Sequence, residues 1–171
     1  MMMDLVHWVR GLPPELATFV IASLPISELR GAIPVALGVY DLPLWSALLW
    51  AILGNLAPIP VILRILEPVS NFLRQRSRVW EGFFQWLFAR TRRRGEHYFR
   101  VYKELGLVLF VAVPLPITGA WTGSVAAFLF GLPPGRSFLL ITLGVLIAAS
   151  VVTSATLGVS WLAFLARHHA Y

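Results

Sequence analysis

Two charged side chains lie inside a long apolar stretch near the start of the chain, in the motif SLPISELRGAIP (residues 23–34). Glu28 and Arg30 are the only charged residues between Thr18 and Tyr40. At the centre of a lipid bilayer each charge would cost at least about 2.5–3.5 kcal/mol on insertion scales. Because this cost is high, the carboxylate and the guanidinium indicate a role in binding or in moving a proton or ion. The alternative is that the two charges form a structural pair that closes a turn.

The composition indicates that this motif belongs to an integral membrane protein. Of the 171 residues, 58% are hydrophobic and 13% are charged, whereas a soluble domain carries about 25% charged residues. A bilayer core about 30 Å thick is spanned by roughly 20 apolar residues in a helix, and open sheet edges do not survive in lipid. The sequence therefore predicts an all-α integral membrane protein. Four apolar stretches support this prediction: residues 14–40, 42–66, 105–130 and 137–166.

Basic residues concentrate in the middle of the chain. Residues 67–104 hold nine basic and four acidic side chains, a net charge of +5 out of +6 for the whole chain. The basic residues are Arg74, Arg76, Arg78, Arg90, Arg92, Arg93, Arg94, Arg100 and Lys103. Cytoplasmic loops of membrane proteins carry such an excess, which we favour over a nucleic-acid surface. The aromatic rings of residues 79–88 are typical of an interfacial helix, so we expect a basic amphipathic cytoplasmic linker and no nucleic-acid partner.

The apolar segments repeat. The motif LPIS (24–27) recurs as LPIT (115–118). The stretch LPLWSALLWAILG (42–54) aligns without gaps on LPPGRSFLLITLG (132–144). The second alignment pairs Gly54 with Gly144. Each copy holds an apolar segment broken near its centre and then an apolar segment that is expected to be unbroken.

The breaks are rich in proline. Pro25 and Pro34 bracket the first break, and Pro114, Pro116 and Gly119 mark the second. Proline removes a helical hydrogen bond and clashes with the preceding turn. The arms on either side have about 10–12 residues, which at 1.5 Å per residue reach only the bilayer midplane. Each broken segment is therefore predicted to be a re-entrant helical hairpin.

These patterns predict two inverted repeats, each a re-entrant helical hairpin followed by a transmembrane helix, an architecture known from secondary transporters. The acidic loop at Asp41 is expected outside the cell, and the loop at 131–136 inside. The predicted organisation is a single membrane domain, 1–171, with the first repeat at 1–66, the linker at 67–104 and the second repeat at 105–171.

The motifs ELRGAIP (28–34) and PLPITGAWTG (114–123) resemble the small multidrug export family of prokaryotic membrane proteins, which is distantly similar to the DedA/VTT superfamily. The resemblance covers most of the chain. It implies paired re-entrant helices in a prokaryotic plasma membrane. The DedA relatives are linked to moving lipid carriers such as undecaprenyl phosphate, with acidic and arginine residues in the hairpins. Glu28 and Arg30 match that pattern, whereas residues 105–130 contain no arginine or carboxylate.

We therefore expect a multi-pass membrane transporter of the DedA-like type that translocates an anionic lipid or a lipid-carrier phosphate, with proton coupling through Glu28. The alternatives are a small multidrug or cation exporter and a non-transporting membrane scaffold. The chain has no catalytic motif and no histidines at metal-ligand spacing, so we expect no enzyme, no metal and no cofactor. The expected partners are membrane lipids and a second copy of the chain.

The predicted pathway for substrate or ion lies at the two breaks. Its residues are Ser27, Glu28, Arg30, Gly31, Pro34, Pro114, Pro116, Thr118, Gly119, Trp121 and Gly123. The hydroxyls of Ser27 and Thr118 are expected to cap the second arm of each hairpin. Together the two positions predict two half-helix N-termini at the bilayer midplane, a geometry suited to an anionic headgroup. GAWTG (119–123) and the spacing of Ser150, Ser154 and Gly158 predict close helix packing.

Overall fold

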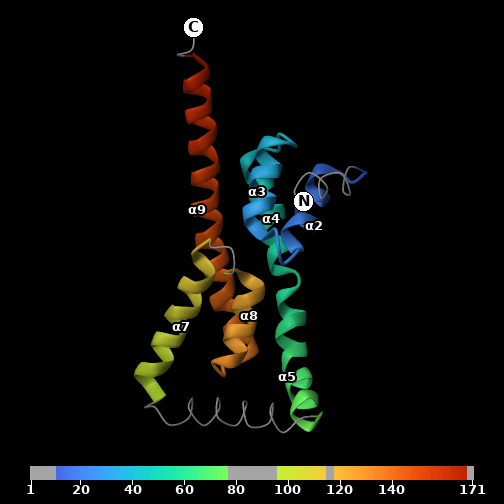
Figure 1. The fold of residues 1–171 in the computed structure, drawn as a ribbon, viewed down its shortest axis with the longest axis vertical. Coiled ribbons are helices and arrows are strands. Elements are labelled where there is room, and N and C mark those ends of the chain that lie inside the picture. Colours follow the sequence, from blue (N-terminus) through green and yellow to red (C-terminus); the bar gives the residue numbers. More distant parts are fainter. Residues whose placement is uncertain (1–10, 77–95, 115–117, 169–171) are drawn as a thin grey trace. The chain divides into compact units, whose positions relative to one another are not determined.

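The computed structural model describes residues 11–76, 96–114 and 118–168, and every regular element among them is an α-helix (Figure 1). The helices are α2 (Pro14–Ser23), α3 (Glu28–Gly38), α4 (Leu44–Leu56), α5 (Ile59–Arg76), α7 (Glu96–Ala112), α8 (Ala120–Leu129) and α9 (Pro134–His168). The all-α prediction is confirmed for these residues. Within the described chain, Leu44–Val69 and Pro134–Leu162 are long and apolar enough to cross a membrane, judged by length and composition.

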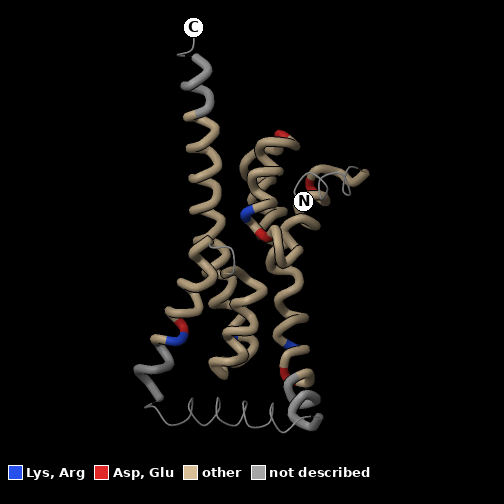
Figure 2. Tube along the Cα trace, viewed as in Figure 1, with Lys and Arg blue, Asp and Glu red and all other residues tan. Residues whose placement is uncertain are grey.

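The described residues leave most of the apolar surface of both segments uncovered. Only 39% of the most apolar window of each is buried, whereas a core helix of a soluble protein is mostly buried. Trp45, Leu139 and Val159 are 70%, 69% and 67% exposed. Figure 2 shows charge at only a few points on otherwise uncharged helices. Apolar surface of this extent marks contact with lipid or a partner.

The chain divides into two compact units. The first comprises Met1–Asn55 and Leu146–Tyr171, and the second comprises Leu56–Val145. In the first unit α2 packs against α3, and in the second unit α8 packs against both α5 and α7. Each unit thus contains one helical hairpin together with parts of the longer helices.

Proline explains where the first hairpin bends. Helix α2 ends at Ser23 because Leu24 is extended, with φ −81° and ψ 138°, as expected of a residue that precedes proline. The chain then turns through 24–27, and α3 begins at Glu28, whose N–H donates to the Leu24 carbonyl at 3.1 Å. The two arms have 10 and 11 residues, as expected. The predicted break from Pro25 to Pro34 is wrong in its second half, because the turn occupies 24–27 and Pro34 lies inside α3.

The two arms of the second hairpin differ more in length than the sequence predicted. Its arms are α7, with 17 residues, and α8, with 10 residues. Helix α7 begins at Glu96 and α5 continues to Arg76, so both helices extend into the predicted linker at 67–104. The interfacial helix predicted at 79–88 lies outside the described residues.

The expectation of an unbroken apolar segment after each hairpin holds for α9 and is wrong for the first copy. Helix α4 ends at Leu56 and α5 starts at Ile59. Pro58 and Pro60 explain the interruption, because neither residue has an N–H to donate to the preceding turn. Helix α9 has no such residue after its first position and continues for 35 residues.

The aligned halves of the two copies share a burial pattern. Positions 41–55 and 131–145 have the same degree of burial throughout, except that Ser46 is buried and Arg136 is exposed. The paired glycines also share an environment. A Cβ at Gly54 would overlap the backbone of Phe19 in α2, and a Cβ at Gly144 would meet α7, the first arm of the second hairpin.

Candidate functional site

The tip of the first hairpin places a carboxylate in an unusual conformation. Glu28 is 6% exposed and has φ 46°, in the left-handed region. A residue with a side chain pays about 1–2 kcal/mol there, which glycine avoids. Such residues persist where the surrounding structure holds them, and they cluster at functional sites. The left-handed backbone at the first residue of α3 is therefore a reason to treat Glu28 as a functional residue.

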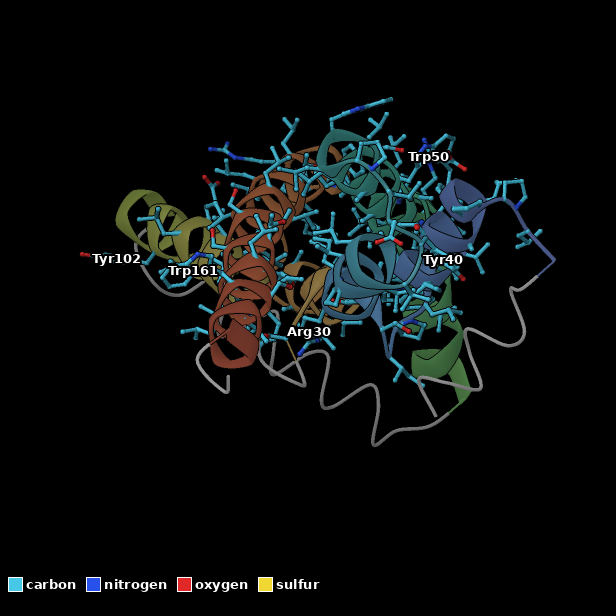
Figure 3. The ribbon with its side chains drawn as sticks, turned by 90° about the horizontal axis from the view of Figure 1, so that it is seen from above. Arg30, Tyr40, Trp50, Tyr102 and Trp161 are labelled. Carbon is cyan, nitrogen blue, oxygen red and sulfur yellow. The ribbon has the colours of Figure 1, made fainter. Side chains whose placement is uncertain are left out.

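The same conformation lets Glu28 and Arg30 meet. Two side chains that are two residues apart on a regular helix point to nearly opposite sides. Glu28 and Arg30 can therefore meet only where the backbone turns at the tip. In the structure Arg30 Nη2 lies 4.0 Å from Glu28 Oε2. The Arg30 side chain is 26% exposed and that of Glu28 is 7% exposed. Arg30 lies at the edge of α3 in Figure 3, so the guanidinium is the more accessible member of the pair.

Gly31 and Pro34 shape the start of α3 around this pair. A Cβ at Gly31 would lie 2.9 Å from the Ser27 Cβ, so the tip is too tight there for a larger residue. Pro34 lies inside α3 and has no N–H to donate to the Arg30 carbonyl, four residues earlier. The Gly31 N–H still makes a regular helical bond to the Ser27 carbonyl at 2.9 Å, so Pro34 is the residue that removes a helical hydrogen bond next to the charged pair.

Neither predicted hydroxyl cap forms. Ser27 is the N-cap residue of α3, but its side chain makes no capping hydrogen bond. In the second hairpin the N-cap residue of α8 is Gly119, and the Thr118 hydroxyl donates to the Val113 carbonyl instead. The reason is geometric, because an N-cap side chain needs an extended backbone at its own residue. Ser27 is helical, with φ −92° and ψ −53°.

The second tip carries no charged residue among its described positions. Thr118 ties it back to the end of α7 through the bond to Val113, and Gly119 is buried with extended backbone. Trp121 is half-buried on the first turn of α8. A Cβ at Gly123 would lie 2.5 Å from Val111, so the close packing predicted for GAWTG is confirmed at this glycine.

Other predicted features lie elsewhere. Pro114 is half-buried beyond the end of α7, and Pro116 lies outside the described residues. The stripe of Ser150, Ser154 and Gly158 is exposed, with nothing within 4 Å of a Cβ at Gly158, so the expected packing there is not made among the residues that the structure describes. The Ser27–Pro34 group lies in the first unit and the Pro114–Gly123 group in the second. Their joint role as a pathway stays a prediction.

Sequence reasoning missed several polar groups. In the first unit the side-chain oxygens of Tyr40, Asn55 and Thr153 are buried without a hydrogen-bond partner among the described residues. Single polar residues in apolar segments gave no spacing signal that could single them out. In the second unit Arg136 contacts both carboxylate oxygens of Glu104, at 2.8 and 2.9 Å. No group of His, Asp or Glu that could hold a metal ion occurs in the part of the chain that the structure describes.

The second arm of the first hairpin, the whole second hairpin and much of the apolar segment after each hairpin match a known family. The model of the family described as "Putative small multi-drug export protein" matches residues 28–151. The chain belongs to this family. The match begins at Glu28 and includes both charged residues of the first tip, the whole second hairpin and the paired glycines. No curated protein and no solved structure matches the chain. Membership of the small multi-drug export family, together with the two long apolar segments, makes this a membrane protein.

The tightness of the first tip has a measurable consequence. Replacing Gly31 by alanine should destabilise the purified protein by about 1–3 kcal/mol, the usual cost of overpacking, because the new methyl group would press on Ser27. Thermal unfolding in detergent measures the change. The double variant Gly31→Ala with Ser27→Gly removes the opposing Cβ and should recover part of the loss. If Gly31→Ala melts like the wild type, the tip is looser than described.

Proposed function

We propose that this protein is a membrane transporter that translocates an anionic amphipathic substrate, such as an anionic lipid or a lipid-carrier phosphate. The observation that carries the proposal is the Glu28–Arg30 pair at the tip of the first hairpin. A charged pair is costly in an apolar segment, and Glu28 is held there at a left-handed φ of 46°. The guanidinium is the more exposed partner, so an approaching ligand meets positive charge first.

An arginine suits this substrate class better than a lysine would. Its planar guanidinium binds phosphate or carboxylate oxygens with two parallel hydrogen bonds. Glu28 already occupies the neighbourhood of Arg30 at 4.0 Å, so an anionic substrate would compete with this carboxylate. Protonation of Glu28 would remove the competitor and favour the substrate. Proton coupling follows from this competition, and transport of this kind needs no catalytic residue, cofactor or metal.

The proposed architecture is a pair of inverted repeats with re-entrant hairpins. Three observations support it. Helices α2 and α3 have 10 and 11 residues, or about 15–17 Å each, roughly half of a 30 Å bilayer core. Positions 41–55 and 131–145 share their burial pattern. Gly54 and Gly144 both pack against the first arm of the preceding hairpin.

This architecture places the loops after the two hairpins on opposite sides of the membrane. We propose that the protein is multi-pass in a prokaryotic plasma membrane, with residues 67–104 in the cytoplasm. The chain has no cysteine, so single cysteines can be introduced at Asp41 and at Gly135, both of which are exposed. In intact cells an impermeant thiol reagent should label Asp41→Cys, and it should label Gly135→Cys only after permeabilisation. Labelling of both from the same face would contradict the inverted arrangement.

A second candidate function is export of small drugs, which the family description favours. For a cationic drug the binding group would be the Glu28 carboxylate rather than Arg30. The lower exposure of Glu28 makes this the less favoured assignment. A non-transporting scaffold is the third possibility, in which neutralising either charge would leave function intact.

One experiment separates these functions. The purified protein is reconstituted in phosphatidylcholine vesicles, and flux is measured for a fluorescent lipid phosphate and for a fluorescent lipophilic cation. We expect faster movement of the lipid phosphate than in empty vesicles, and loss of that movement in Arg30→Gln. Flux of the cation alone, lost in Glu28→Gln and kept in Arg30→Gln, would replace the anionic substrate by a drug. Absence of both fluxes would favour a scaffold.

A further inference from the structure

A groove between α7 and α8 belongs to the second unit, and neither Glu28 nor Arg30 lines it. It has a volume of about 320 Å³, near the lower end of the range of about 300–1,000 Å³ for small-molecule sites. Its lining residues are Tyr102, Lys103, Gly106, Phe110, Ala126 and Phe130, all within the second unit. The inference drawn from this groove does not depend on the proposed transport function.

The spacing of the lining residues explains why a groove forms. Tyr102, Gly106 and Phe110 are four residues apart and so share one face of α7. Ala126 on α8 and Phe130, the residue that follows α8, have the same spacing. The small residue of each stripe leaves room between the larger rings, and a Cβ built at Gly106 meets nothing within 4 Å. The floor of the groove is therefore open space rather than a contact between the two helices.

The rings that border the groove are not covered by the part of the chain that the structure describes. Tyr102 is 71% exposed and its side chain points away from α7 in Figure 3. Phe110 and Phe130 are 36% and 39% exposed. Almost all of the groove's lining surface is apolar. Such a surface in a membrane protein suits a hydrocarbon chain, which fills an apolar slot without needing hydrogen bonds.

A positive charge is fixed at the edge of this apolar slot. Lys103 Nζ donates to the Phe130 carbonyl at 3.0 Å, at the C-terminal end of α8. Arg136 contacts both oxygens of the adjacent carboxylate, Glu104. Partial burial lowers the pKa of Lys103, and an anion beside the ammonium would offset that loss of hydration.

We propose that this groove binds one membrane lipid with an anionic headgroup. The acyl chain lies along the faces of Tyr102, Gly106 and Phe110, and the phosphate contacts the Lys103 ammonium. Charge complementarity at Lys103 selects an anionic lipid over a zwitterionic one. The bound lipid fills the space between α7 and α8 that the protein leaves open.

The test uses proteoliposomes of phosphatidylcholine that contain a small fraction of phosphatidylglycerol with a diazirine in its acyl chain. After illumination, adducts are mapped by mass spectrometry of peptides. The reference probe is phosphatidylcholine with the same diazirine chain. In the wild type we expect adducts on the groove residues with phosphatidylglycerol in excess over phosphatidylcholine, and in excess over adducts at Leu139, a 69% exposed position on α9.

Two substitutions at Gly106 test whether the groove must be open for the lipid to bind. Gly106→Leu fills the slot, and because position 106 is open the backbone should not shift. Groove adducts should fall by about tenfold, the factor expected from losing roughly two buried methylenes. Gly106→Ala leaves most of the space and should retain adducts. Labelling at Leu139 should be the same in both variants, and unfolding temperatures check that each is folded.

The charge is tested separately. Lys103→Met keeps the apolar stem, so total groove adducts should persist while the preference for phosphatidylglycerol falls by about twofold to fivefold, the range for a partly exposed ion pair. Three results would overturn the proposal. They are unchanged groove labelling in Gly106→Leu, equal labelling of the wild type by the two lipids, and groove labelling no higher than at Leu139. A groove covered by a second copy of the chain would give the first or the third result.

Discussion

The variant Gly54→Ala is expected to unfold at a clearly lower temperature than the wild-type protein. A Cβ at Gly54 would overlap the carbonyl oxygen of Phe19 and lie 2.9 Å from its Cα. These are backbone atoms of α2, so the overlap can be relieved only by moving a helix. Overpacking costs about 1–3 kcal/mol and occasionally more, and this contact belongs at the upper end. For a chain of this length each kcal/mol is worth roughly 2–4 °C.

Matched glycines provide the controls for this prediction. Gly158→Ala changes a helical glycine with nothing within 4 Å of its Cβ, and it should melt at or slightly above the wild-type temperature, because alanine favours helix by about 1 kcal/mol. Gly144→Ala meets the Val111 side chain at 2.7 Å. The double variant with Val111→Ala should therefore recover part of the loss. Thermal unfolding in detergent measures all four variants, and a wild-type midpoint for Gly54→Ala would contradict the described packing of α4 on α2.

Neutralising Glu28 is expected to abolish the response of transport to pH while leaving the fold intact. Glu28→Gln has nearly the same shape and cannot compete for Arg30 as an anion. It should therefore behave as the protonated protein does at every pH. Binding of a lipid phosphate should be at least as tight as in the wild type, and transport driven by an imposed pH gradient should fall at least tenfold, or about 1.4 kcal/mol.

A second substitution separates function from stability at the same position. Glu28→Gly also removes the carboxylate, and it relieves the cost of a left-handed side-chain-bearing residue, about 1–2 kcal/mol. It should therefore lose gradient-driven transport without the drop in unfolding temperature that a misfolded hairpin would show. Arg30→Lys should impair binding more than its retained charge suggests, since a bidentate contact to phosphate is lost.

The measurement is flux of a fluorescent lipid phosphate in proteoliposomes with the inner and outer pH varied independently. Thermal unfolding of each variant is followed in parallel. A wild-type pH response in Glu28→Gln would reduce Glu28 to a structural partner of Arg30. Loss of flux in both Glu28 variants accompanied by a matching loss of stability would point to hairpin architecture rather than to proton coupling.

Much of the fold was readable from local pattern. The shortage of charge predicts helices in a membrane, and Pro25 locates the turn of the first hairpin, because a residue before proline leaves the helix. Pro34 does not end a helix, since it lies inside α3. The pairing of Gly54 with Gly144 was visible as sequence identity before their contacts were known. Signals of this kind are strong because they act within a few residues of one another.

Other features depended on which segments come together in space. The left-handed backbone of Glu28 and its contact with Arg30 arise at a turn whose conformation is set by the packing of α2 on α3. The Ser27 and Thr118 hydroxyls do not cap, because the backbone at the tips takes up other angles than a cap requires. The break at 57–58 could have been inferred from Pro58 and Pro60, but it was obscured by the continuous apolar run.

The groove between α7 and α8 was not visible in the sequence at all. Gly106 and Ala126 are ordinary small residues in apolar helices, and nothing local indicates that they border the same space. Lys103 read only as one of nine basic residues in a charged region. The sequence alone determined which stretches are helical, apolar and broken, because those properties come from near neighbours. Only the tertiary structure decided which charge lies at which apolar surface, because that depends on contacts between residues far apart in the chain.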